Sequence, residues 1–264
     1  MKKAISVLGL ALAAATLPAQ AALLMPSFDG APTGWVTDRY DPSAFADVGT
    51  YQGKSDVLGI GISAADGINN RPVAYQSTFY NTQGKQYAIS GGAGDTLAAS
   101  LYIPAEWRSE QNGNVRTDMW GVMNGGPALD YTIIGFTNYG GSARLRVWDD
   151  ETSLGWVDLL TAINFDAWTD LDIIFTGSAY EYKVNGNVVY TDSTVSGATG
   201  FGATIMQAYN FCGGDPNVPN ATCADYTAHW ANTQEATVPE PGTIALVALG
   251  MICLLGARPR RRRA

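Results

Sequence analysis

Two short groups of carboxylates are the first candidates for chemistry in this sequence. Glu106 and Glu110 lie four residues apart beside Trp107, and residues 149–151 read Asp-Asp-Glu. Cleavage of a glycosidic bond uses two carboxyl groups placed across that bond. Neighbouring residues of a strand point to opposite faces, so the consecutive group cannot flank one bond. The spacing Glu-x-Asp-x-x-Glu, which would supply such a pair, does not occur. We expect both groups in polar loops.

Other catalytic sets are not recognisable in the sequence. The chain has a single histidine, His229, and nothing marks a nucleophile elbow, so no Ser-His-Asp set can be assigned. The glycine-rich residues 91–95 precede an expected strand and lack the lysine of a phosphate-binding loop. We therefore predict that the protein is not an enzyme and has no catalytic residues, no metal ligands and no cofactor. Binding of a structural calcium ion is left as an alternative, although no calcium-binding motif supports it.

Aromatic residues are the remaining candidates for a binding site. Phe, Trp and Tyr make up 11% of the chain, and their ring faces can stack on sugars. The candidates are Trp107, Trp120, Trp148 and Trp156. Core packing is the competing role of each and is the more frequent one for aromatic residues.

The charge of the chain argues against nucleic acid as a partner. Residues 23–237 contain nine Lys and Arg against twenty-three Asp and Glu, a formal net charge of −14. Binding of phosphate backbones requires surfaces rich in cations, and a negative field of this size repels them. The acidic surface instead suits a soluble exported domain.

The cysteines agree with an oxidising compartment. Cys212 and Cys223 share one loop rich in Gly and Pro, which predicts a disulfide between them. A zinc site is the rival interpretation, but two cysteines and His229 fall short of four ligands.

The N-terminus predicts export. Residues 1–21 form a signal peptide in which two lysines precede a short apolar run, and Ala19 and Ala21 frame a cleavage site for signal peptidase. The mature chain is expected to begin at Ala22.

The C-terminal tail begins with a linker, residues 233–242. This linker contains Pro239, Glu240 and Pro241, and the two prolines favour an extended backbone that exposes the glutamate to a processing enzyme.

A hydrophobic helix and a basic end complete the tail. Residues 243–257 are apolar and are just long enough for a transmembrane helix, and residues 258–264 form a cytoplasmic tail. Positive flanks stay on the cytoplasmic side of the membrane. The residues that set this orientation are Arg258, Arg260, Arg261, Arg262 and Arg263.

This order of Pro-Glu-Pro, hydrophobic helix and arginine cluster resembles the PEP-CTERM sorting signal. The resemblance implies recognition by an exosortase, a membrane-embedded transpeptidase-like cysteine protease that cleaves near Pro-Glu-Pro. It also implies an inner-membrane-anchored precursor that then passes to the cell surface or biofilm matrix of a Gram-negative bacterium. A plain membrane anchor is the alternative.

The middle of the chain, residues 22–232, predicts one all-β ectodomain with antiparallel sheets. Its clearest element is a hairpin over residues 179–191, where apolar and polar residues alternate up to an Asn-Gly turn. Further short strands are expected over residues 86–90, 97–103, 131–136, 143–148 and 171–176.

Residues 168–175 followed by residues 180–186 resemble the central hairpin of concanavalin A-like and laminin-G-like jelly rolls. The resemblance implies a β-sandwich made of two curved sheets, a fold often used to bind glycans or proteins. We therefore expect a cell-surface or matrix protein that binds polysaccharide or another envelope component. The alternatives are a secreted polysaccharide hydrolase or lyase, and a structural matrix protein without a defined ligand.

Overall fold

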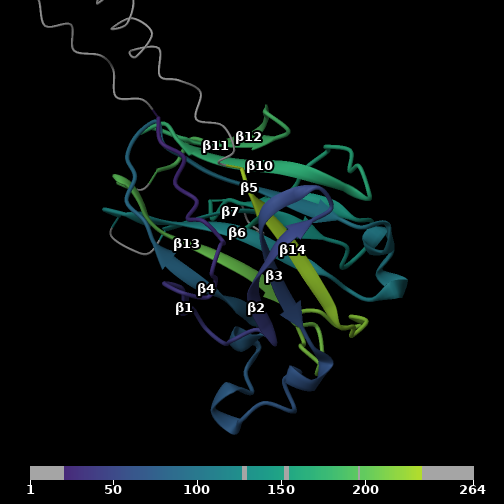
Figure 1. The fold of residues 1–264 in the computed structure, drawn as a ribbon. Coiled ribbons are helices and arrows are strands. Elements are labelled where there is room, and N and C mark those ends of the chain that lie inside the picture. Colours follow the sequence, from purple (N-terminus) through teal and green to yellow (C-terminus); the bar gives the residue numbers. More distant parts are fainter. Residues whose placement is uncertain (1–20, 127–129, 152–154, 196, 234–264) are drawn as a thin grey trace, which may run out of the picture. The chain divides into compact units, whose positions relative to one another are not determined.

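Strands dominate the computed structural model, which describes residues 21–126, 130–151, 155–195 and 197–233. Figure 1 shows these strands stacked in two layers. The strands are β1 Val36–Thr37, β2 Ala44–Tyr51, β3 Lys54–Ile62, β4 Thr82–Ala88, β5 Thr96–Ile103, β6 Arg116–Asn124, β7 Asp130–Thr137, β8 Arg144–Trp148, β9 Trp156–Asp158, β10 Ala167–Phe175, β11 Tyr180–Val184, β12 Asn187–Asp192, β13 Gly200–Tyr209 and β14 Tyr226–Asn232. The described helices are short 3₁₀ turns: η1 Ala64–Asp66, η2 Val73–Tyr75, η3 Thr78–Asn81, η4 Ala105–Arg108 and η5 Glu110–Asn112.

The strands form two sheets in which neighbouring strands run antiparallel. The first sheet has the order β1-β4-β13-β6-β7-β8-β9, and the second has the order β12-β11-β10-β5-β14-β3-β2. Strands distant in sequence pair in both sheets, because β13 lies between β4 and β6 and β14 lies between β5 and β3. The predicted all-β sandwich is therefore confirmed.

Alternation of buried and partly exposed residues explains the hairpin near the middle of the chain. Leu171, Ile173 and Phe175 of β10 point into the core, and the residues between them are less buried. The turn between β11 and β12 consists of Asn185 and Gly186, with φ angles of 50° and 77°. Two-residue hairpin turns of this type require positive φ at both positions, which Asn and Gly tolerate.

The core lies between the two sheets. Large side chains from both layers, among them Phe136, Phe175 and Trp230, are almost completely shielded from solvent. The buried indole of Trp230 donates a hydrogen bond of 2.9 Å to the hydroxyl of Thr117, so its polar atom is satisfied. Burial of these apolar groups holds the sheets face to face.

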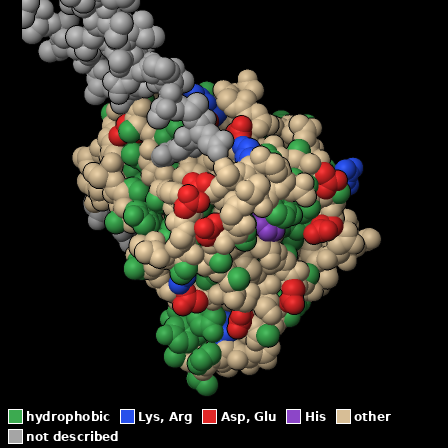
Figure 2. Space-filling model, viewed as in Figure 1, with side chains coloured by type: hydrophobic (Ala, Val, Ile, Leu, Met, Phe, Trp, Pro, Cys, Tyr) green, Lys and Arg blue, Asp and Glu red, His purple; other side chains and the backbone are tan. Residues whose placement is uncertain are grey.

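The molecular face drawn in Figure 2 carries scattered acidic side chains, as expected for an acidic exported domain. Hydrophobic side chains gather at its lower end, where residues 63–81 project beyond the sheets. Val73 and Phe79 in this segment are 86% and 57% exposed.

The predicted strand over residues 86–90 is displaced in the structure, where β4 runs from Thr82 to Ala88. Strands β1, β2, β3, β6, β9, β13 and β14 were not predicted. The signal peptide, the Pro-Glu-Pro triplet, the hydrophobic helix and the arginine cluster lie outside the described residues, apart from Ala21. Within the described residues, no helix has the length and apolar character needed to cross a membrane.

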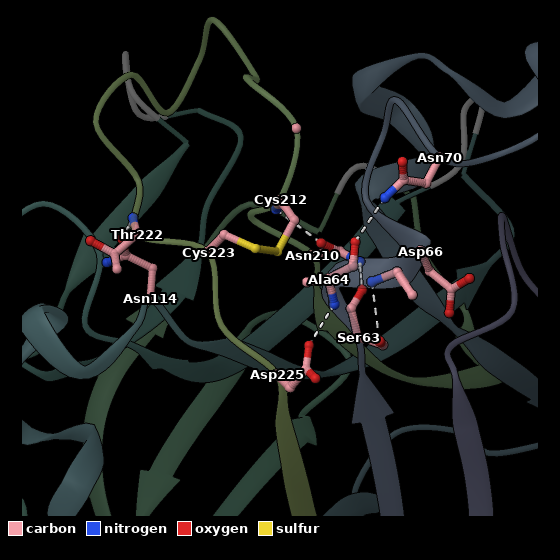
Figure 3. The surroundings of a disulfide bond; sticks show 12 residues. Ser63, Ala64, Asp66, Asn70, Asn114, Asn210, Cys212, Thr222, Cys223 and Asp225 are labelled. Atoms are coloured by element: carbon pink, nitrogen blue, oxygen red, sulfur yellow. Dashed lines mark hydrogen bonds between the residues drawn. A yellow bond between two sulfur atoms is a disulfide. The ribbon is translucent and has the colours of Figure 1, made fainter.

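A disulfide closes the connection between β13 and β14 (Figure 3). The predicted bond between Cys212 and Cys223 is confirmed, and their Cα atoms lie 4.7 Å apart. The backbone N–H of Cys212 donates to the side-chain oxygen of Asn210 at 2.9 Å, and Asn210 directly follows the last residue of β13 in the first sheet. The bond therefore ties this loop to the sheet.

Replacing Cys212 and Cys223 together with serine is expected to lower the free energy of unfolding by about 3 kcal/mol. The bond spans 11 residues, and closing a loop of this size removes conformational entropy from the unfolded chain. Urea denaturation of the oxidised wild type and the double variant measures the difference, and reduced wild type serves as the control. Equal stability of the oxidised wild type and the variant would contradict the expectation.

Candidate functional site

Three of the four candidate tryptophans meet on the outer face of the first sheet, which points away from the core. Trp120 of β6 lies opposite Ile133 of β7, which lies opposite Trp148 of β8, which lies opposite Trp156 of β9. Trp107 is placed elsewhere: it is 3% exposed and packs on Phe136 inside the core. The sequence therefore identified most of an aromatic row, although the neighbours in that row come from separate strands.

The aromatic row forms the floor and walls of a hollow of about 310 Å³. The rings of Trp148 and Trp156 meet edge to face, with centroids 5.2 Å apart. Trp120 and Tyr131 meet in the same way at 5.4 Å. The residues that line this hollow are Arg39, Thr82, Arg116, Trp120, Tyr131, Ile133, Trp148 and Trp156. Rings fixed in this way present rigid apolar surface at little conformational cost.

A polar row runs beside the aromatic row. Gln207 of β13, Asp118 of β6, Gly135 of β7 and Arg146 of β8 lie opposite one another in turn. Asp118 is fully buried, and its Oδ2 accepts hydrogen bonds from Arg116 Nε at 2.7 Å and from Gln207 Nε2 at 2.5 Å. Its second oxygen, Oδ1, accepts no hydrogen bond from any residue that the structure describes. Asp118 therefore orients Arg116 from beneath and does not itself reach the surface.

Gly135 makes room for this arrangement. A Cβ atom at this position would lie 2.2 Å from Asp118 Oδ1 and 2.4 Å from the backbone oxygen of Thr117. Both distances are far below van der Waals contact. The missing side chain therefore allows the Asp118 carboxylate to lie over the neighbouring strand.

Arginines cover this polar row. Arg144 pairs with Asp158 of β9 at 2.8 Å, and Arg116 pairs with Asp118 at 2.7 Å. The guanidinium of Arg146 lies 3.7 Å above the ring of Trp156, within the range of a cation–π interaction. Burial, followed by the nearby guanidinium of Arg116, lowers the pKa of Arg146.

A second hollow of about 300 Å³ adjoins the first, because Arg116 and Trp156 line both. Its other lining residues are Thr137, Tyr139, Arg146, Tyr209, Phe211, Asn217 and Val218. The Tyr209 hydroxyl donates to the buried carboxylate of Asp215. Burial and this hydrogen bond raise the pKa of Tyr209 to about 12, so its proton is held. Tyr139 stacks on Phe211 with a centroid distance of 5.5 Å.

Together the two hollows combine aromatic surface with hydrogen-bond donors, which suits a sugar chain. Stacked rings can contact the apolar faces of sugars, and guanidinium groups can donate to their oxygens. Asp118 and Asp158 do not form a hydrolytic pair, because three strand spacings, roughly 14 Å, separate their strands. Asp118 is also shielded from a ligand.

An acidic cluster lies beyond the end of β8. Carboxylate oxygens of Asp149, Glu151 and Asp192 lie within 4.8 Å of one another, close enough to coordinate one divalent cation. Asp149 is 7% exposed, so it lies deeper than the polar loop we expected, and it accepts a hydrogen bond from Tyr190 at 2.5 Å. Burial and the neighbouring Asp150 raise the pKa of Glu151 to about 7.

The remaining residues named from the sequence have structural surroundings. Glu106 and Glu110 lie in the short helices η4 and η5, and Glu110 accepts a hydrogen bond from the backbone of Gly140 at 3.0 Å. His229 of β14 stacks on Tyr51 at 3.8 Å, on the second sheet, and burial lowers its pKa. None of the three lines either hollow of the first sheet.

A sequence signal for the arginines exists but was missed. Residues 116–120 read Arg-Thr-Asp-Met-Trp, and residues 144–148 read Arg-Leu-Arg-Val-Trp. In both segments the first, third and fifth residues face outward, and they are an arginine, a charged residue and a tryptophan. The residues between them face the core. Alternation of this kind is typical of a strand with one functional face.

Comparison with known families confirms the tail. Residues 237–262 match the PEP-CTERM protein-sorting motif. The chain is therefore a surface-directed, exported protein, and the motif implies processing by an exosortase. No curated protein matches the chain closely enough to count as a relative.

Several solved structures are similar to this chain at low sequence identity. A Bacillus licheniformis β-glucanase is 12% identical, with a TM-score of 0.47, and the match covers 80% of this chain and 97% of that one. A lichenase from a mouse hindgut metagenome is 14% identical, with a TM-score of 0.47 and coverage of 79% and 97%. The carbohydrate-binding module CBM66 from Bacillus subtilis is 14% identical, with a TM-score of 0.35 and coverage of 67% and 91%. At these scores the likenesses transfer no activity to this chain.

The prediction that the protein is not an enzyme is corrected by these comparisons. The similar structures include a β-glucanase and a lichenase, which contradicts the prediction. The prediction rested on the missing Glu-x-Asp-x-x-Glu spacing. That spacing describes groups along one strand. Neighbouring strands also bring groups together, as the polar row of Asp118, Gly135 and Arg146 demonstrates.

Replacing Gly135 with alanine is expected to destabilise the fold by about 1 to 3 kcal/mol, because the added methyl group overpacks against Asp118. The matched control is Gly92→Ala, where a Cβ would meet no atom within 4 Å. Thermal and urea denaturation of both variants measure the effect. Equal stability of the two variants would show that Asp118 can move aside without cost.

Proposed function

We propose that this surface-directed protein binds a polysaccharide chain on the outer face of its first sheet and cleaves it. The observation that carries the proposal is the row of Trp120, Trp148 and Trp156 beside two adjoining hollows. A sugar chain is a ligand that offers apolar ring faces and many hydroxyl groups at a regular spacing. The aromatic row and the polar row match these two properties.

Delivery to the surface follows from the tail. The precursor is anchored in the inner membrane by residues 243–257, with the ectodomain outside the cytoplasm. An exosortase then cleaves near Pro239, Glu240 and Pro241 and passes the protein to the cell surface or matrix. The sorting motif and the disulfide between Cys212 and Cys223 support this route.

Stacking gives the sugar chain its position. Trp156 lines both hollows, so a ring bound on it is adjacent to the next ring in either direction. Arg116 also lines both hollows, and its position is held by Asp118 from beneath. These two residues therefore define where a glycosidic bond crosses from one hollow to the other.

Tyr139 is the group in the second hollow that is suited to move a proton during cleavage. It lines the hollow beside Arg116 and Arg146, whereas Tyr209 is committed to Asp215. Its phenolic hydroxyl can both donate and accept a proton, as a proton-transfer group must. Cleavage by elimination leaves an unsaturated sugar at the new end, and hydrolysis leaves a saturated one. The products therefore distinguish a lyase from a hydrolase.

Two variants separate binding from cleavage. Trp156→Ala is expected to weaken binding by about 1 kcal/mol, roughly fivefold, through the loss of stacking. Tyr139→Phe is expected to bind normally and to lose cleavage at least a hundredfold, as is usual for a proton-transfer group. The full chain, purified in detergent, is tested by affinity electrophoresis and by assay of new sugar ends on a panel of neutral and acidic polysaccharides.

The matched control is Trp168→Ala, which removes a partly buried tryptophan from the second sheet. It should leave both measurements unchanged. Retention of no polysaccharide by the wild type, or equal retention by the Trp156 and Trp168 variants, would refute this site. Binding without any new sugar ends would refute the cleavage step.

A further inference from the structure

Cations are concentrated on the site face of an otherwise acidic domain. Residues 23–237 contain nine Lys and Arg against twenty-three Asp and Glu. Four of those nine lie on the outer face of the first sheet or over it: Arg39, Arg116, Arg144 and Arg146. Three of these four, Arg39, Arg116 and Arg146, line one or both of the two hollows.

Three of these four arginines form ion pairs, and the fourth forms none with the described residues. Arg39 pairs with Asp38 at 3.5 Å, Arg116 with Asp118 at 2.7 Å, and Arg144 with Asp158 at 2.8 Å. Arg146 lies in the sheet between the Arg116–Asp118 pair and the Arg144–Asp158 pair. It forms no ion pair with any described residue. The carboxylates nearest to it are already shared with other arginines.

The Arg146 side chain is also short of hydrogen-bond acceptors. Its Nε is buried and has no partner within the described part of the chain. Stacking on Trp156 at 3.7 Å stabilises the cation through the ring face but accepts no N–H bond. A buried charged donor without an acceptor is costly, and an anionic ligand in the hollow would remove that cost.

The polysaccharide class follows from these contacts. We propose that the polysaccharide bound on the first sheet is anionic, and that an acidic group on one sugar is held by Arg146 and Arg116 beside Trp156. This inference rests on the proposed function and adds the charge of the substrate to it. The planar fork of a guanidinium matches an oxyanion with two parallel hydrogen bonds, so a uronate carboxylate and a sulfate ester share the required chemistry.

The acidic remainder of the domain sharpens this selectivity. A net charge of −14 over residues 23–237 repels polyanions from the other surfaces. An anionic polysaccharide is therefore admitted only where the arginines offset that field. Attraction at one site combined with repulsion elsewhere favours a specific ligand over indiscriminate adhesion.

The test compares polymers that differ only in charge. Full chain in detergent is titrated by calorimetry with polygalacturonate and with its carboxyl-reduced form, and with dextran sulfate and uncharged dextran. Binding to at least one charged polymer should be tenfold or more tighter than to its uncharged counterpart. The polygalacturonate arm reports carboxylate recognition, and the dextran sulfate arm reports sulfate recognition.

Substitutions then assign the recognition to a residue. Arg146→Gln should reduce affinity for the preferred charged polymer at least tenfold, and Arg146→Lys, which keeps the charge without the fork, should lie between it and the wild type. Lys183→Gln on β11 of the second sheet removes the same charge elsewhere and should change nothing. Circular dichroism of each variant checks its fold.

Equal affinity of the wild type for the charged and uncharged members of both pairs would overturn the proposed charge preference. This comparison needs no variant, so misfolding of Arg146→Gln does not affect it. If uncharged polymers bind equally well at the tryptophan row, the proposed function stands and only the substrate class is wrong. If neither these four polymers nor the wider panel bind, both proposals fail.

Discussion

The strict alternation of side chains in β6, β7 and β8 is the constraint on which the rest of the site depends. In β6 it sends Thr117 and Met119 into the core and leaves Asp118 and Trp120 on the outer face. A slip of one residue in pairing would exchange these two sets. Core packing therefore fixes the register, and the register places the aromatic and polar rows side by side.

Features that depend on residues close in sequence were predicted correctly, whereas pairings between distant strands were not predicted. The Asn185–Gly186 hairpin and the Cys212–Cys223 bond each depend on residues close in sequence, and both are confirmed. In the polar row, residues 118, 135 and 146 meet through the pairing of β6, β7 and β8, and residue 207 joins them only because β13 lies between β4 and β6. No short spacing indicates the position of β13 in the sheet. The arginines share strands with Trp120 and Trp148, and the alternation that marks them was missed.

The chemistry of the domain is consistent with export from the cytoplasm. An exported domain needs a soluble surface, which its acidic residues provide, and a stapled loop, which the disulfide provides. On this acidic domain, Arg116, Arg146 and Trp156 form a small cationic and aromatic surface, which we propose as the polysaccharide site. Asp118 and Gly135 line neither hollow, yet they determine where Arg116 lies.

The position of a bound sugar chain tests the central claim most directly. A crystal structure of the protein with the shortest oligosaccharide that it retains would locate that chain. We predict sugar rings on Trp156 and Trp148, with an acidic group within hydrogen-bond distance of Arg146. An oligosaccharide bound instead over β3 and β14 of the second sheet, with the hollows of the first sheet empty, would contradict it.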